Sequence, residues 1–225
     1  MWHLTFRTRI TGPYDAPMDP LSRTERAALC NTALEIGESA PTLCGDWTVK
    51  DLVVHLVLRE RSPAAVGILV PPLSGLTDAA SRHLARTDFA VLVERLRGGP
   101  PRWSPVALPP VDAAVNTLEY LVHHEDVRRA QPTWSPRDLD DSAERAVWRA
   151  LHPMAKVLTR PVPAGVVLED SVSGSRLSAS RGAGQTVVRG RPSEIALYLF
   201  GRKEQADVEV TGDAAGTVDE TPLGL

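Results

Sequence analysis

The amino-acid sequence predicts an α+β protein, with a helical bundle over residues 20–160 and a small α+β domain over residues 161–225. From Ser22 to Leu158, hydrophobic residues recur every three or four positions, which is the spacing of amphipathic helices. After Pro161 the pattern changes to short β-rich segments separated by glycine-containing turns. The composition, with 43% hydrophobic and 24% charged residues, is that of a globular protein and excludes extensive disorder.

Residues 1–19 differ from the rest of the chain. They contain Gly12-Pro13 and Pro17 and show no periodic hydrophobic pattern. We predict that they form a disordered or mis-called extension, with Met18 as an alternative start.

The first helix is predicted to begin near Ser22. Glu25 follows Ser22 by three positions, which is the spacing of a capping box. Hydrophobic residues then recur at helical spacing as far as Ile36, and Gly37 is a typical residue for the end of a helix.

The second helix is predicted to begin at another capping box, formed by Thr48 and Asp51. Its hydrophobic spacing continues to about Arg61. His55 lies within this run, so either a buried, hydrogen-bonded histidine or a ligand histidine is consistent with its position.

Further helices are predicted at about residues 76–84, 88–97, 111–130 and 141–158. Pro153 lies inside the last of these. Because proline lacks an N–H and its ring clashes with the preceding turn, we expect it to kink or interrupt that helix.

The C-terminal part is predicted to form a small sheet with one helix. Strand-like segments occupy residues 166–168, 177–180, 186–188 and 207–210. A helix over residues 195–200 separates the last two strands and ends at Gly201.

The charge balance and composition exclude several classes of partner. The net charge of −3 and the 5% aromatic content favour no nucleic-acid partner. The longest stretch without charges, Ser62–Thr77, contains prolines and is too short to span a membrane, and no secretory signal is visible. Cys30 and Cys44 are too few for a disulfide framework, so we expect buried structural thiols and a cytoplasmic protein.

The strongest candidate for chemistry combines Glu119, His123 and His55. Glu119 and His123 are four positions apart on a predicted helix, so both side chains lie on one face and can bind one metal ion. His55, on another helix, is the natural third ligand, since helix bundles build metal sites from facing helices. An ordinary polar pair explains the Glu119–His123 spacing equally well. His124 is a competing ligand, but it points about 100° away from His123.

Two segments of the sequence resemble the DinB-like metal-binding superfamily, and in particular the mycothiol-dependent maleylpyruvate isomerase-like family of actinobacteria. The first is segment 41–56 (PTLCGDWTVKDLVVHL), which leads to His55. The second is segment 116–126 (NTLEYLVHHED), in which Glu-x-x-x-His is followed by Asp126. The C-terminal part is similar to the small sterol-carrier-like domain that this family carries, with a helix that ends in Gly201-Arg202. The resemblance implies a DinB-like four-helix bundle with a metal site, followed by that α+β domain.

The resemblance also implies ligands and cofactors. His55, Glu119 and His123 would bind one divalent metal, expected to be zinc, with mycothiol as a thiol cofactor. Asp126 would support the site or cap it, although a solvated helix charge is an equal alternative. The sequence departs from the family at His124-Glu125, where the isomerases carry a small residue and an aromatic one, so the substrate stays open.

The implied chemistry is activation of a small-molecule thiol that attacks an electrophilic substrate, because a metal lowers the pKa of a bound thiol. Arg59 and Arg202 are candidates to hold carboxylates of substrate or cofactor, since a guanidinium matches a carboxylate; purely structural roles are the alternative. A non-catalytic metal- or small-molecule-binding bundle is the competing function. The apolar stripe of the first helix offers a surface for a homodimer.

Overall fold

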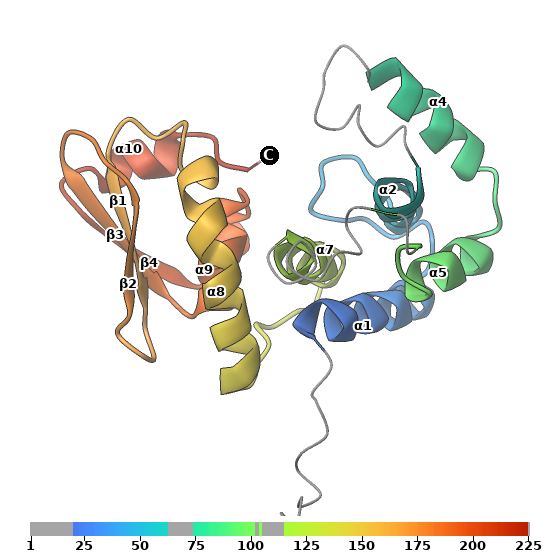
Figure 1. The fold of residues 1–225 in the computed structure, drawn as a ribbon, viewed down its shortest axis with the longest axis horizontal. Coiled ribbons are helices and arrows are strands. Elements are labelled where there is room, and N and C mark those ends of the chain that lie inside the picture. Colours follow the sequence, from blue (N-terminus) through green and yellow to red (C-terminus); the bar gives the residue numbers. More distant parts are fainter. Residues whose placement is uncertain (1–19, 63–73, 102–103, 105–114, 225) are drawn as a thin grey trace, which may run out of the picture.

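The computed structural model describes residues 20–62, 74–101, 104 and 115–224. It has the α+β class that the sequence predicts: helices form the N-terminal part, and a four-stranded sheet with helices forms the C-terminal part (Figure 1). The predicted extension over residues 1–19 lies outside the described residues. Within the described part, no helix combines the length and hydrophobicity needed to cross a membrane.

The N-terminal part is a four-helix bundle with one outlying helix. Buried side chains of four helices, Leu29, Leu52, Leu92 and Tyr120 among them, form one hydrophobic cluster. These helices are α1 (Leu21–Ile36), α2 (Val49–Arg61), α5 (Phe89–Arg97) and α7 (Thr117–Arg129), and α4 (Ser74–Leu84) lies outside them. The predicted helical bundle is therefore confirmed as a fold class, while its bounds at residues 20 and 160 stay a prediction.

The two predicted capping boxes have different outcomes. The Thr48–Asp51 box is confirmed: Asp51 N donates to Thr48 Oγ1 at 3.3 Å, and Thr48 N donates to Asp51 Oδ2 at 3.0 Å. The Ser22–Glu25 box is wrong, because α1 begins after Pro20 without a side-chain cap. The Glu25 carboxylate instead contacts His124 of α7, 3.0 Å away.

One predicted helix is described only in part, and another lacks an interruption at its proline. The helix predicted over residues 111–130 is described from Thr117 to Arg129, and residues 111–114 lie outside the described part. Helix α8 (Asp141–Leu158) continues through Pro153 without interruption. Pro153 and Arg149, whose carbonyl loses its helical N–H partner, are both exposed, so water can replace the missing hydrogen bond.

The sheet has the order β2-β1-β3-β4. The central strands β1 and β3 are parallel, and the outer strands β2 and β4 each pair antiparallel with a central one. The bounds are β1 (Gly165–Asp170), β2 (Arg176–Ser180), β3 (Gln185–Gly190) and β4 (Val208–Gly212), with α9 (Pro192–Leu199), the 3₁₀ turn η5 (Lys203–Gln205) and α10 (Ala215–Glu220). The sequence pattern did not predict α10.

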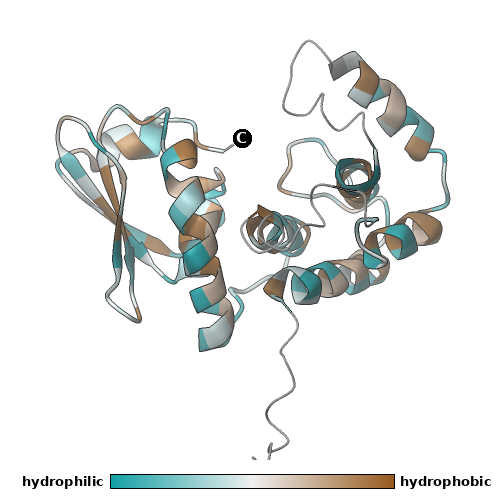
Figure 2. Cartoon of the chain, in the orientation of Figure 1, coloured by the Kyte–Doolittle hydropathy of each residue, from teal (hydrophilic) through white to brown (hydrophobic). Residues whose placement is uncertain are grey.

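A second hydrophobic core joins the sheet to α7, α8 and α9. Val147, Leu151 and Leu158 of α8 pack in the same cluster as Val166 and Leu168 of β1. The hydrophobic residues that line these helices can be followed in Figure 2. Helix α8 therefore packs with the sheet that follows it in the sequence. The domain boundary near residue 160 stays a prediction.

Helix α7 contributes side chains to both cores. Leu118, Leu121 and Val122 belong to the cluster with the sheet, whereas Tyr120 and Val127 belong to the bundle cluster. The polar residues of α7 are therefore held between the bundle and the C-terminal part, where they meet side chains from both.

Candidate metal centre

The structure brings His55, Glu119 and His123 together. His55 comes from α2, and Glu119 and His123 lie one turn apart on α7. One ligand atom from each side chain lies within 4.8 Å of the others, as a shared metal ion requires. All three residues are partly buried, so the group keeps limited contact with solvent.

The distances in this group fit metal ligands better than hydrogen bonds. Glu119 Oε1 lies 3.5 Å from the Nε2 atoms of both His55 and His123. That separation is long for a hydrogen bond. A tetrahedral zinc site with bonds of about 2.0–2.1 Å has ligand atoms about 3.4 Å apart. Two imidazoles and one carboxylate are donors that zinc accepts, and they leave a position open for a further ligand. The residues therefore fit a divalent metal.

Asp126 orients one of these candidate ligands, His123. Its side chain is fully buried, and its Oδ2 accepts a hydrogen bond from His123 Nδ1 at 2.9 Å. With Nδ1 protonated, His123 Nε2 faces Glu119, and its lone pair is free to bind a metal. Carboxylates in this position are typical of metal-binding histidines. The alternative of a solvated helix charge is excluded for Asp126 by its burial.

Arg202 also meets Asp126, although the two residues are 76 positions apart in the chain. Arg202 Nε donates to Asp126 Oδ1 at 2.7 Å, and Nη2 donates to Oδ2 at 2.6 Å. Gly201, which precedes it, has φ +87°, a conformation that favours glycine. Arg202, one of the predicted site residues, therefore lies near His123, and both residues hydrogen-bond to Asp126.

Cys44 is a residue of this site whose place the sequence pattern did not predict. Its Sγ donates to Asp126 Oδ2 at 3.1 Å, and Arg202 Nη2 lies 3.4 Å from it. The expectation of a buried structural thiol is correct for Cys30, where burial raises the pKa to about 11. Cys44 is only partly buried, and it lies in the loop before α2 within the family-like motif.

Cys44, His123 and Asp126 form a second group with ligand spacing. Its electrostatics are unfavourable for a cation, because the Arg202 guanidinium already donates to both oxygens of Asp126. In the group of His55, Glu119 and His123, no arginine of the described part of the chain donates to both oxygens of the carboxylate. Arg59 Nε lies 3.3 Å from Glu119 Oε1, and its shorter contact is the 2.8 Å hydrogen bond from Nη1 to Asn116 Oδ1.

The pKa shifts follow from these contacts. Burial would raise the pKa of Glu119, but the two histidines and Arg59 outweigh it and hold that pKa well below its usual value. Burial would lower the pKa of His123, but Asp126 and Cys44 raise it well above its usual value. Burial also opposes ionisation of Asp126, yet hydrogen bonds from His123 and Arg202 lower its pKa.

Two neighbouring residues complete the surroundings. The ring centroid of Trp47, which is 40% exposed, lies 5.1 Å from that of His55. His124, the competing ligand, turns away and contacts Glu25 and Thr32, each at 3.0 Å. Helical spacing predicted that His124 points away from His123, whereas it did not predict the contact between Trp47 and His55.

The chain was compared with known proteins. Neither the protein-family models nor the curated proteins gave a match. Two solved structures match with a TM-score of 0.59 each. One is a mycothiol-dependent maleylpyruvate isomerase at 18% identity, and the other is a histidine-to-alanine mutant of a mycothiol-dependent maleylpyruvate isomerase at 17% identity. Each match covers 90% of this chain and 95% of the matched chain.

These matches extend over both parts of the molecule, and their identities are low, so what they show is the fold. The chain shares with the mycothiol-dependent maleylpyruvate isomerase structures a fold in which a helical N-terminal part precedes a small α+β C-terminal part, as the resemblance of its two sequence motifs implied.

Proposed function

We propose that this protein binds one divalent metal, expected to be zinc, through His55, Glu119 and His123, and that it is a mycothiol-dependent isomerase or thiol transferase. Its substrate would be an electrophilic small molecule. The observation that carries the proposal is the convergence of three zinc-type donors in a chain with the fold of a mycothiol-dependent enzyme: Glu119 Oε1 lies 3.5 Å from each histidine Nε2, and all three ligand atoms lie within 4.8 Å of one another.

The residues of the chain have distinct roles in this proposal. A divalent cation held by these donors would lower the pKa of a bound thiol, so that the thiolate forms near neutral pH. Asp126 keeps His123 in the tautomer whose Nε2 is free. Arg59 and Arg202, each anchored by a hydrogen bond to a side-chain oxygen, offer guanidinium groups to carboxylates of the substrate or the cofactor.

The first test is elemental analysis of the purified, untagged protein. We expect about one equivalent of divalent metal per chain in the wild type and a large loss in His55→Ala, because the site has three protein donors. His83→Ala, which changes an exposed histidine of α4, is the matched control and keeps the metal. A wild type without stoichiometric metal after reconstitution contradicts the proposal.

The second test is turnover. The zinc-loaded protein is assayed with maleylpyruvate for isomerisation and with an activated aryl chloride for thiol transfer, each with and without mycothiol. Turnover that requires both mycothiol and Glu119 supports the enzyme. Metal binding without turnover in either assay favours the non-catalytic binding protein instead.

The cellular compartment is part of the same proposal. Cys30 and Cys44 are both free thiols in the structure, which suits a reducing environment. We therefore propose a cytoplasmic protein whose partners are a small-molecule thiol and an electrophile.

A further inference from the structure

Two arginine–carboxylate pairs join α7 to the segment 194–207, and they run in opposite directions. In the first, the arginine follows α9 and the carboxylate is on α7: Arg202 donates two hydrogen bonds to Asp126, at 2.7 and 2.6 Å. In the second the arginine is on α7: Arg129 donates to Glu194 of α9, at 2.6 and 2.9 Å. Asp126 and Arg129 are three positions apart, so they are neighbours on the same face of α7.

The second pair also binds the backbone on the far side of Arg202. Arg129 Nη1 donates to the carbonyl oxygen of Gln205, and Glu194 Oε2 accepts from the backbone N–H of Asp207 at 2.9 Å. In the sequence, Arg202 lies between Glu194 on one side and these two backbone groups on the other. The short segment that carries Arg202 is therefore held at both ends by one guanidinium and its carboxylate partner.

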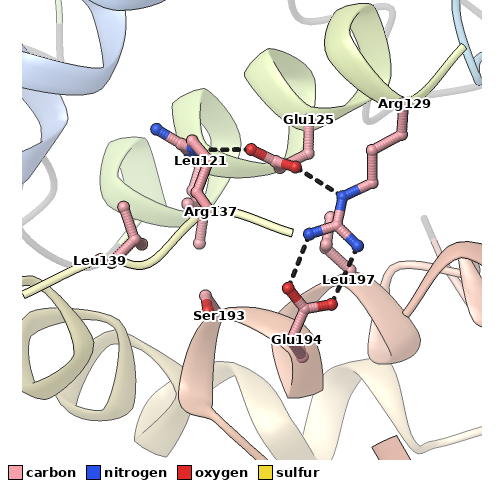
Figure 3. Close-up of a pocket in the computed structure, with 8 residues that line it drawn as sticks. All are labelled: Leu121, Glu125, Arg129, Arg137, Leu139, Ser193, Glu194 and Leu197. Carbon is pink, nitrogen blue, oxygen red and sulfur yellow. Dashed lines mark hydrogen bonds and ion pairs between the residues drawn. The ribbon is translucent and has the colours of Figure 1, made fainter. Parts of the chain in front are cut away.

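This pair is buried, and each of its side-chain nitrogen and oxygen atoms has a hydrogen-bond partner. The side chains of Arg129 and Glu194 are 1% and 5% exposed, and Arg129 Nε donates to Glu125 Oε2 at 2.5 Å (Figure 3). The pocket around them has a volume of about 10 Å³, so it is too small for a substrate. These charges therefore do not bind a ligand.

Stability alone is a weak reason for such a pair. Two buried charges lose their hydration, and apolar residues of similar volume often pack the same space with equal stability. A bidentate pair adds one property that an apolar contact lacks, because two parallel hydrogen bonds fix the orientation of the planar guanidinium relative to the carboxylate. The pair thus specifies how α9 and the following turn lie against α7.

We propose that Arg129 and Glu194 are positioning residues that hold Arg202 at Asp126, beside His123 and Cys44. Their effect on turnover rests on the role of Arg202 under Proposed function, whereas their effect on the geometry of Arg202 does not. The two effects are therefore measured separately.

The geometric test uses the side-chain Nε–H signal of Arg202 in the NMR spectrum of the ¹⁵N-labelled full chain, assigned by its loss in Arg202→Lys. In the wild type this proton is hydrogen-bonded to Asp126, so we expect it to be protected from exchange with water. In Glu194→Gln we expect it to lose that protection. In the control Arg137→Gln it stays protected, because Arg137 contacts Glu25 and Glu125 of the same network and leaves the Arg129–Glu194 pair intact.

An unchanged Arg202 signal in folded Glu194→Gln overturns the proposal, and so does an equal loss of protection in Arg137→Gln. If Glu194→Gln does not fold, Arg129→Lys takes its place. Lysine keeps the charge of Arg129 but not its two parallel donors, so the proposal requires the same loss of protection there.

The kinetic test uses mycothiol-dependent turnover of the zinc-loaded enzyme. We expect Glu194→Gln to lower kcat/KM by at least about tenfold, through the same parameter, kcat or KM, that Arg202→Lys changes. The double variant should be no worse than Arg202→Lys alone, because both changes act on one group. Additive losses contradict positioning. A wild type that lacks turnover contradicts the proposed function, and the NMR result then decides the positioning by itself.

Discussion

His123 Nδ1 lies 2.9 Å from Asp126 Oδ2, within one turn of α7, and the Asp126 side chain is completely buried. The contact leaves the other nitrogen of His123 directed at Glu119. A local i,i+3 pair on one helix thus orients a candidate ligand of the proposed metal site, to which His55 of another helix would contribute as well.

The first prediction concerns Asp126→Asn. The change removes the charge that stabilises His123 as a donor and leaves Arg202 without its counter-ion, so zinc affinity should fall by about 10–100-fold. Competition titration with a chelator of known affinity measures it. Asp78→Asn on α4, an exposed site, is the control and should bind zinc like the wild type. Equal affinities in the two variants would show that Asp126 does not support the site.

The second prediction concerns pH. The pKa of His123 is raised in the metal-free protein, so its imidazolium must lose a proton before zinc binds. Zinc affinity should therefore rise with pH, by about tenfold per unit while one proton is released, and level off above the raised pKa. Calorimetric titrations in buffers of different ionisation enthalpy report the protons released. An affinity independent of pH near neutrality contradicts the raised pKa.

The raised pKa of His123 and the lowered pKa of Asp126 make the stability of the metal-free fold depend on pH in opposite directions. Because the folded pKa of His123 is raised, its contribution is present below its unfolded pKa and is lost as the pH rises through the folded value. Because the folded pKa of Asp126 is lowered, its contribution is present above its unfolded pKa of about 3.9 and is lost as the pH falls. Urea unfolding across acid and neutral pH should show the acid loss in the wild type and a smaller loss in Asp126→Asn.

The third prediction separates the two groups with ligand spacing. Cys44→Ser should keep the full equivalent of zinc, because Cys44 belongs only to the group that Arg202 already neutralises. Elemental analysis beside His55→Ala measures this. Loss of zinc in Cys44→Ser, with zinc retained in His55→Ala, would assign the metal to the second group instead.

The fourth prediction concerns Gly201, which directly precedes Arg202. Gly201 has φ +87°, and a Cβ there would lie 2.5 Å from the carbonyl oxygen of Leu223. Gly201→Ala should lower the free energy of unfolding by about 1–3 kcal/mol, and the displaced Arg202 should lower turnover as well. Chemical denaturation measures the first effect.

Gly216→Ala is the matched control for Gly201→Ala. Gly216 lies in α10, and a Cβ there meets no atom within 4 Å. Alanine favours the helical state, so stability should stay the same or rise by up to about 1 kcal/mol. Equal destabilisation by the two substitutions would contradict the proposed clash with Leu223.

The sequence by itself determined the features that depend on neighbours along the chain. The Thr48–Asp51 capping box, the end of α1 at Gly37 and the shared face of Glu119 and His123 all follow from spacing within one or two turns. The strand-like segments after residue 160 were likewise predictable, because turn residues and β-branched residues act locally. Recognition of the fold rested on two such local motifs, around His55 and Glu119.

Only the tertiary structure decided which distant residues meet. Arg202 reaches Asp126 across 76 positions, and Cys44 joins them from the loop before α2. The Ser22–Glu25 spacing suggested a cap, yet Glu25 contacts His124 and α1 has no side-chain cap. The physical reason is that hydrophobic periodicity specifies which face of an element is buried, not what covers it. Which groups pair with the buried charges of α7 depends on how the two hydrophobic cores pack on either side of that helix.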